Sequence, residues 1–236
     1  MVNEILTAAA ALTAAGDRGA MATLIEGPGA GRAVLVDAAG VVLQGHDLPE
    51  AVATLVPVVL EQGKPRVAEA DGNTWFVEPV LPPPKLIVLG AIAAADALVP
   101  MAIAAGFAVH VIDTREWLAD EVRYPGAASV RCGVPIERLQ EVGVDVATSV
   151  VSFLHEARLE DEVLIEALSR PARYTGSMGS GKNSSAKRER LAAAGVDPTL
   201  LERLRAPIGL SIGSRTPQEM AVAVLAEVVA VGRGHG

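Results

Sequence analysis

Several residues that could bind an anionic ligand follow directly after predicted strands in the second half of the chain. Gly90, Ala91 and Ile92 form a tight turn after one apolar run, and Asp113 and Arg115 follow the next run. Ligands of open parallel sheets bind at the carboxyl ends of strands, so these five residues are candidate binding residues. The acid lies at a spacing from the turn glycine that suits a hydrogen bond to a ribose hydroxyl, although it could instead cap the following loop. The arginine could contact a phosphate or remain solvated.

Two further candidates follow later apolar runs. His155 comes after the run VVSFL, where an imidazole could bind a ligand, exchange a proton or simply lie on the surface. The segment GSMGSGKNSS contains Gly179, Ser180, Gly181 and Lys182 ahead of a predicted helix. Its backbone N–H groups could hold an anion, although a glycine-rich connection without a ligand has the same composition. It is not a Walker A loop, because asparagine follows the lysine.

The sequence predicts neither a catalytic centre nor a metal site. It contains no nucleophile elbow, no carboxylate pair at a fixed spacing and no HxH or HExxH pair. Cys132 is the only cysteine, which excludes an intramolecular disulfide and a cysteine-built metal centre. We expect Cys132 to be a small buried hydrophobe, and the alternative is a reactive thiol.

The elements that position these candidates predict an α/β fold. Residues 85–113 read as a βαβ nucleotide-binding unit, although Ile92 replaces the middle glycine of the G-x-G-x-x-G/A fingerprint and so disfavours a dinucleotide in the usual pose. Strands alternate with helices beyond it, which predicts a C-terminal Rossmann-like domain with a largely parallel sheet. The predicted strands lie at 86–89, 107–112, near 130, at 148–153 and at 173–178, and the predicted helices at 91–105, 136–141, 160–168, 184–194, 198–204 and 217–231. Acids at the start of helix 160–168 should interact favourably with the positive end of its dipole. Thr216, Pro217 and Glu219 should cap the last helix.

A run of three prolines at 82–84 marks the boundary with a smaller N-terminal α+β domain. We predict domains over residues 1–81 and 85–236. In the first domain we expect two hairpins, a helix from Asn3 to Ala15 and a single helix from Leu48 to Gln62.

Charge and composition exclude several classes of partner. The net charge is −8 and aromatic residues make up 3% of the chain, so neither a basic surface nor a stacking platform for nucleic acid is expected. No apolar run approaches the roughly 18 residues of a membrane span, and the N-terminus lacks the basic start of a signal peptide. We expect a cytoplasmic protein that binds neither nucleic acid nor membrane.

The motifs taken together resemble the XdhC/CoxI family of accessory factors for molybdenum hydroxylases. The matching segments are LIVLGA at 86–91, VHVIDTRE at 109–116, VVSFLHE at 150–156, RYTGSMGSGK at 173–182, RERLAAAGVD at 188–197 and the tail APIGLSIGSRTPQEM. The resemblance implies a cytoplasmic protein that binds molybdenum cofactor (molybdopterin). Such a protein helps a cofactor sulfurase replace the terminal oxo group of the cofactor with a sulfido group, and then hands the cofactor to an apo molybdenum hydroxylase. The cofactor could also be the cytosine dinucleotide form, and we expect a homodimer. By resemblance, Gly90, Asp113, His155 and the residues from Gly179 to Lys182 fall on family motif positions that border a ligand crevice.

This chain also departs from the family pattern. The region reading GPGAGRAVLVDAAGVVLQGHDLPEAV lacks the cysteine motif usual there, Ile92 and Ala93 replace glycine and histidine of a GAGHV turn, and Leu154 replaces the threonine of a Thr-His pair. We therefore expect a divergent, non-catalytic chaperone. The alternatives are an NAD(P)-dependent oxidoreductase, suggested by the βαβ unit and Asp113, and a non-catalytic ligand-sensing domain.

Overall fold

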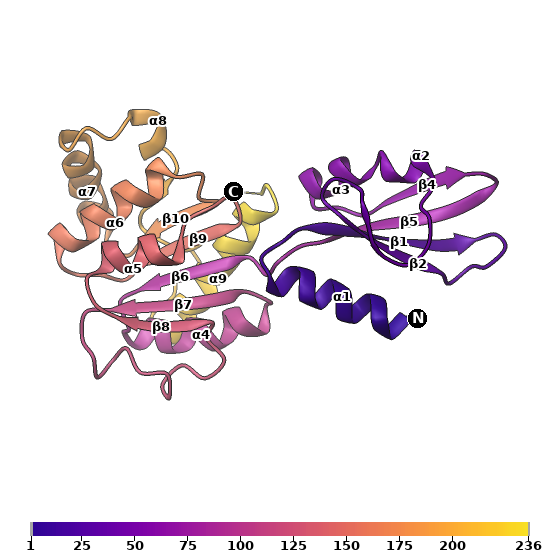
Figure 1. Cartoon of the computed structure of the whole chain (residues 1–236). Coiled ribbons are helices and arrows are strands. Elements are labelled where there is room, and N and C mark those ends of the chain that lie inside the picture. The colour runs from indigo at the N-terminus through magenta and orange to yellow at the C-terminus, as the bar shows by residue number, and fades with distance from the viewer. Residues whose placement is uncertain (1, 236) are drawn as a thin grey trace. The chain divides into compact units, whose positions relative to one another are not determined.

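The computed structural model describes residues 2–235 and divides into two compact units, Met1–Pro83 and Pro84–Gly236 (Figure 1). The fold is α/β, with a six-stranded Rossmann-like sheet in the second unit and a smaller antiparallel sheet in the first. The candidate residues all lie in the second unit.

The first unit packs helices against a five-stranded antiparallel sheet of order β3-β2-β1-β5-β4. Its elements are α1 (Val2–Ala14), β1 (Gly19–Glu26), β2 (Ala33–Asp37), β3 (Val42–Gln44), α2 (Glu50–Ala53), α3 (Val56–Gln62), β4 (Arg66–Ala70) and β5 (Asn73–Val80). Val52, Val56 and Val59 of α2 and α3 are buried against β1, β2 and β5, and this contact forms the core of the unit.

The single helix expected between Leu48 and Gln62 is wrong, because the structure breaks it into α2 and α3 at Thr54 and Leu55. Pro57 lies in the first turn of α3, where its missing N–H is tolerated. In a continuous helix the same proline would remove an internal hydrogen bond and clash with the preceding turn. The proline therefore explains the break.

The second unit is a six-stranded sheet of order β11-β10-β9-β6-β7-β8 in which every strand pair is parallel. Its elements are β6 (Lys85–Leu89), α4 (Ala93–Ala104), β7 (Ala108–Asp113), β8 (Ser129–Cys132), α5 (Pro135–Val142), β9 (Thr148–Ser152), α6 (Ala157–Ser169), β10 (Tyr174–Ser177), α7 (Gly181–Ala193), α8 (Pro198–Leu201), β11 (Leu204–Arg205) and α9 (Pro217–Gly232). Strand β6 is central, and the chain leaves it toward β7 and later returns to β9 on its other side. The carboxyl ends of β6 and β9 therefore meet at a topological switch point.

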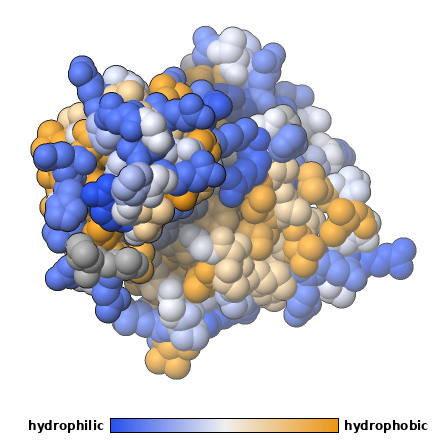
Figure 2. All heavy atoms as spheres, turned by 90° about the vertical axis from the view of Figure 1, so that its right-hand side faces the viewer, coloured by the Kyte–Doolittle hydropathy of each residue, from blue (hydrophilic) through white to orange (hydrophobic). Residues whose placement is uncertain are grey.

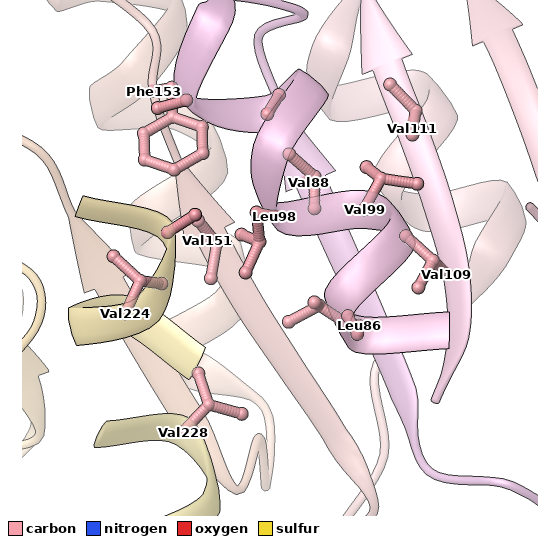
Figure 3. Close-up of a cluster of buried hydrophobic side chains, with 14 of the residues drawn as sticks. Leu86, Val88, Leu98, Val99, Val109, Val111, Val151, Phe153, Val224 and Val228 are labelled. Carbon is pink, nitrogen blue, oxygen red and sulfur yellow. The ribbon is translucent and has the colours of Figure 1, made fainter. Parts of the chain in front are cut away.

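Alternate residues of the central strands serve two separate cores. Leu86 and Val88 of β6 pack with Leu98 of α4 and Val224 of α9 on one face of the sheet, as Figure 3 shows. Ile87 and Leu89 face the opposite core, which α5 and α6 cover. Burial on both faces explains why β6 reads as an unbroken apolar run rather than an alternating one.

The C-terminal segments differ in part from the sequence prediction. The helix expected over 198–204 is shorter, because Leu204 and Arg205 form β11, a sixth strand that pairs with β10. The predicted cap of the last helix is confirmed, since the Thr216 hydroxyl accepts from Glu219 N–H at 3.2 Å and the Glu219 carboxylate accepts from Thr216 N–H at 3.0 Å. These two bonds fix where α9 begins.

Hydrophobic and hydrophilic residues are interspersed on the face that Figure 2 shows. Among residues 2–235, no helix is long and apolar enough to cross a membrane.

Candidate functional site

Gly90 makes the turn between β6 and α4 possible. Its φ is +96°, and a Cβ added to it would lie 3.1 Å from the backbone carbonyl of Phe153, just past the end of β9. Glycine therefore serves both the left-handed conformation and the close approach of two strand ends. Ala91 is buried directly after the turn.

Ile92 is the N-cap of α4, and its side chain is half-buried against the core formed by α4 and α9. It makes no side-chain cap, so the first N–H groups of α4 lack the partner that a serine or aspartate would give them. Those amides and the positive end of the helix dipole lie beside the Gly90 turn. This arrangement suits a negatively charged group.

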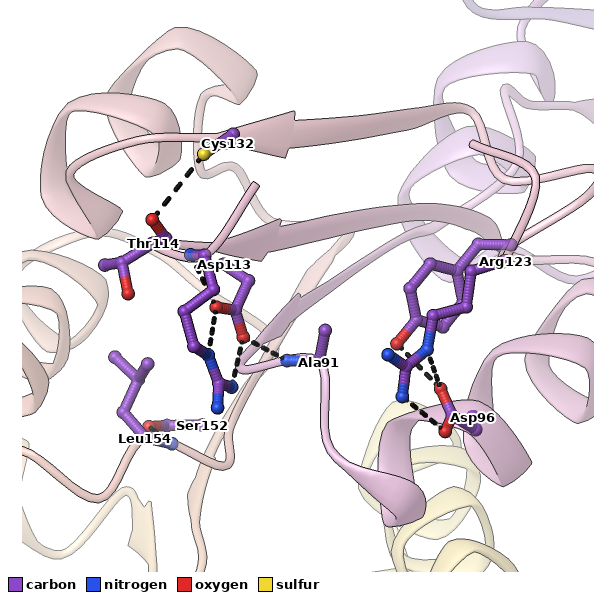
Figure 4. Close-up of polar contacts among 10 residues, drawn as sticks. Ala91, Asp96, Asp113, Thr114, Arg123, Cys132, Ser152 and Leu154 are labelled. Carbon is purple, nitrogen blue, oxygen red and sulfur yellow. Dashed lines mark hydrogen bonds and ion pairs between the residues drawn. The ribbon is translucent and has the colours of Figure 1, made fainter. Parts of the chain in front are cut away.

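Asp113 ends β7 and links it to the Gly90 turn (Figure 4). Its Oδ2 accepts a 2.7 Å hydrogen bond from Ala91 N–H, while Arg115 donates its backbone N–H and its Nε–H to Oδ1 and an Nη2–H to Oδ2. Burial alone would raise the pKa of Asp113, but the hydrogen bonds from Arg115 and Ala91 outweigh it, so the pKa is lowered. Asp113 is therefore an ionised carboxylate that ties two strand ends together.

A second carboxylate anchors the loop that follows β7. Asp96, in the first turn of α4, accepts two hydrogen bonds from the Arg123 guanidinium at 2.8 and 2.7 Å and one from the Tyr124 hydroxyl at 2.8 Å. The Arg123 bonds lower the pKa of Asp96, and burial and the bond to Asp96 raise the pKa of the Tyr124 hydroxyl. The loop is thereby held to the N-terminal end of α4.

The ends of β9 and β10 hold a buried polar cluster, formed by Ser152, Ser177, Glu160 and Lys187. Glu160 Oε1 accepts from the hydroxyls of Ser152 and Ser177 at 2.9 and 2.7 Å, and its Oε2 lies 2.8 Å from Lys187 Nζ. Lys187 also donates to the Ser177 hydroxyl and to the Met178 carbonyl, the latter at 3.0 Å. Both charged side chains are only 5% exposed.

This cluster corrects the expected role of Glu160. The sequence predicted a helix that begins there, with acids favouring the helix dipole, but α6 begins at Ala157 and Glu160 points into the interior. Its partner Lys187 lies on α7, so the pair joins α6 to α7 beneath the loop after β10. Lys187 also holds this loop directly, because the Met178 carbonyl accepts a hydrogen bond from its ammonium group.

The glycine-rich segment forms the start of α7 rather than a long loop. The predicted helix start at Ser184 is wrong, because the Ser180 side chain caps the helix by accepting from Asn183 N–H at 3.3 Å. Gly181 and Lys182 are therefore in the first helical turn, and both are exposed. The segment thus presents N–H groups and a lysine at the carboxyl end of β10, where the glycine-rich prediction had placed an anion site.

The structure brings the candidate residues to one edge of the sheet without placing them in a single contact. Strands β10, β9, β6 and β7 are successive neighbours, so three inter-strand steps, about 14 Å, separate the ends of β7 and β10. His155 is exposed between them, after β9. A ligand that contacts both Arg115 and the start of α7 must therefore be extended.

Comparison with known proteins shows what this domain is related to. The profile described as the XdhC Rossmann domain matches residues 86–228, which is more than half of the chain. The chain belongs to the XdhC family. A protein of Bacillus subtilis, named as a probable xanthine dehydrogenase subunit, is 28% identical over 157 residues, covering 66% of this chain and 46% of that protein. The molybdenum cofactor insertion chaperone PaoD of Escherichia coli is 26% identical over 147 residues, covering 62% of this chain and 40% of that protein.

A solved structure agrees with the XdhC assignment at the level of fold. The crystal structure of a protein described as a xanthine dehydrogenase from Bacillus halodurans has a TM-score of 0.78 and 22% identity, covering 99% of this chain and 65% of that one. This chain spans less than half the length of the Bacillus subtilis and Escherichia coli relatives.

Two features of this XdhC domain escaped the sequence prediction. Cys132 is exposed rather than buried, because it ends the edge strand β8, and its Sγ lies 3.6 Å from the Thr114 carbonyl oxygen (Figure 4). The buried polar cluster was missed as well. Its only sequence signal was Ser152 and Ser177, polar residues at the carboxyl ends of β9 and β10. Within the described part of the chain, no three His, Cys, Asp or Glu side chains lie together as metal ligands would.

Proposed function

We propose that this chain is a maturation factor that binds the molybdenum cofactor and delivers it to an apo molybdenum hydroxylase. Membership of the XdhC family supports an accessory role, as do relatives named as a molybdenum cofactor insertion chaperone and as part of a xanthine dehydrogenase. When bound in the hydroxylase, the cofactor supplies redox chemistry. The part of this chain is to bind, shield and release it.

The observation that carries the proposal is the chemistry of the sheet's carboxyl edge. Two long helices, α4 and α7, begin there, and Arg115 and Lys182 lie at the ends of β7 and β10. Helix N-termini and cations bind phosphate, and molybdopterin carries a phosphate on an extended pterin. The donor set therefore fits the group. Gly90, Ala91 and Ile92 would hold one end of the ligand, and Gly179 to Lys182 the other.

Further parts of the proposal rest on the family relationship. We propose that His155, exposed after β9, contacts the ligand from between the two ends, and that Asp113 fixes the Gly90 turn. The partners would be the apo hydroxylase and a cofactor sulfurase, and the protein would act in the cytoplasm, as a homodimer. The cytosine dinucleotide form of the cofactor is the alternative ligand.

The test is cofactor retention. The protein is purified from cells that make molybdenum cofactor, and bound pterin is measured by its fluorescence after oxidative release. We expect pterin in the wild-type protein, a several-fold loss in Lys182→Ala, and no loss in the matched variant Lys64→Ala, whose lysine belongs to the other unit. Absence of pterin from the wild-type protein, both as purified and after incubation with molybdopterin, would overturn the proposal.

A further inference from the structure

Asp113 has no acceptor position left for a ligand. A carboxylate offers about four lone-pair positions, and here four donors fill them: Ala91 N–H, Arg115 N–H, Arg115 Nε–H and an Arg115 Nη2–H, at 2.7 to 2.9 Å. The side chain is only 2% exposed. A ribose hydroxyl could reach this carboxylate only after the Arg115 side chain had left it.

Arg115, by contrast, keeps most of its donors. A guanidinium has five N–H groups, and two of them, on Nε and Nη2, are used by Asp113. The other three have no partner among residues 2–235, and the side chain is 43% exposed. The bidentate pair fixes the plane of the guanidinium, so the free N–H groups lie in a defined direction. A second guanidinium, that of Arg123, is close enough to influence the pKa of Arg115, although the bond to Asp113 dominates and raises it.

We propose that Arg115 is a specificity-determining residue that makes the end of β7 select a phosphate rather than a ribose diol. In dinucleotide-binding domains the acid at this place accepts from ribose, whereas a nearby arginine favours a phosphate. Here Arg115 fills acceptor positions on both oxygens of Asp113, and its remaining N–H groups are free to donate to a phosphate. The inference rests on the proposed ligand crevice and narrows its ligand class to a compound with a phosphate at this end, as in molybdopterin without a nucleotide.

Binding a ribose diol in place of a phosphate would cost hydrogen bonds that the structure already makes. Ribose binding to Asp113 would break two charge-assisted hydrogen bonds from Arg115 and expose an ionised, otherwise buried carboxylate. Phosphate binding to the free N–H groups of Arg115 breaks none of these bonds. The structure is therefore already arranged for the anion, and the diol would require a rearrangement.

The test uses two probes that differ by one phosphate, adenosine 5′-monophosphate and adenosine 2′,5′-bisphosphate. Binding is measured by calorimetry at low salt, because phosphate contacts weaken as salt rises. For the wild-type full chain we expect the bisphosphate to bind at least about tenfold more tightly, equivalent to 1.4 kcal/mol. In Arg115→Ala the two affinities should fall within about twofold of each other. Arg115→Lys should recover part of the preference, and Arg190→Ala, which removes a charge paired with Asp161 elsewhere, should keep all of it.

Equal or weaker binding of the bisphosphate to the wild-type protein would overturn the inference, as would a preference that survives in Arg115→Ala. Failure of the bisphosphate to bind at millimolar concentration would overturn it too. The outcome is separable from that of the proposed function. Retained molybdopterin with no Arg115-dependent preference would remove only the selection rule, whereas an Arg115-dependent preference without any retained pterin would remove only the proposed cargo.

Discussion

Replacing Lys187 with methionine should destabilise the C-terminal unit strongly, because the change leaves the carboxylate of Glu160 buried without its cation. Each side chain of the pair is 5% exposed, and the pair joins α6 to α7 at the ends of β9 and β10. Breaking a buried ion pair from one side costs about 3–5 kcal/mol. For a domain of this size about 1 kcal/mol lowers Tm by roughly 2–4 °C, so the transition should move down by about 6–20 °C.

Removing both charges should be less harmful than removing one. In the double variant Glu160→Gln/Lys187→Met the amide oxygen can still accept from Ser152 and Ser177, and no unpaired charge remains in the interior. A matched control is Arg190→Met, which breaks the surface pair with Asp161 and should change stability by about 0–1 kcal/mol.

Scanning calorimetry of the full chain measures these shifts. The reasoning fails if Lys187→Met loses less than about 1 kcal/mol, the value of an exposed pair. It also fails if the double variant loses as much stability as the single variants Lys187→Met and Glu160→Gln together, because additivity would mean that the two side chains do not interact.

Three further predictions concern single residues. Gly90→Ala should cost about 1–2 kcal/mol in denaturant unfolding, because its φ of +96° and the Phe153 backbone at 3.1 Å both oppose a Cβ; an unchanged midpoint would contradict this. The lowered pKa of Asp113 means that its stabilisation is fully present above the ordinary aspartate pKa and is lost as the pH falls through the lower folded-state value. Asp113→Asn should therefore be less stable at neutral pH and flatten the loss of stability under acid, and an unchanged pH profile would refute that assignment. Cys132 should react with a thiol reagent in the native protein about as fast as after unfolding, whereas strong protection would show that it is buried.

The Rossmann core could be predicted because its signals are local. The apolar run at β6, the turn glycine and the capping residues of α9 each act within a few positions of the chain, and the structure retains all three. The strand β11 could not be predicted in this way. It consists of Leu204 and Arg205 alone, and only its pairing with β10 makes it a strand.

The candidate site shows the same division. Turn and strand-end positions such as Gly90 and Asp113 follow from the strand pattern. The side-chain contacts at this edge of the sheet do not follow from it. Lys187 contacts Glu160, for example, only when α6 and α7 pack together. Arg115 lies two positions from Asp113, yet sequence spacing does not reveal that its guanidinium donates hydrogen bonds to both oxygens of the Asp113 carboxylate. Charged pairs inside a fold depend on tertiary packing, which residue types alone do not specify.

Hydrogen–deuterium exchange of the full chain, with and without molybdopterin, tests the central claim most directly because it locates the ligand. The account predicts slower exchange at the amides of residues 90–95 and 179–183, which start α4 and α7 at the carboxyl edge of the sheet. Protection confined to the first unit, or to the outer surfaces of α4 and α9, with these two segments unchanged, would contradict it.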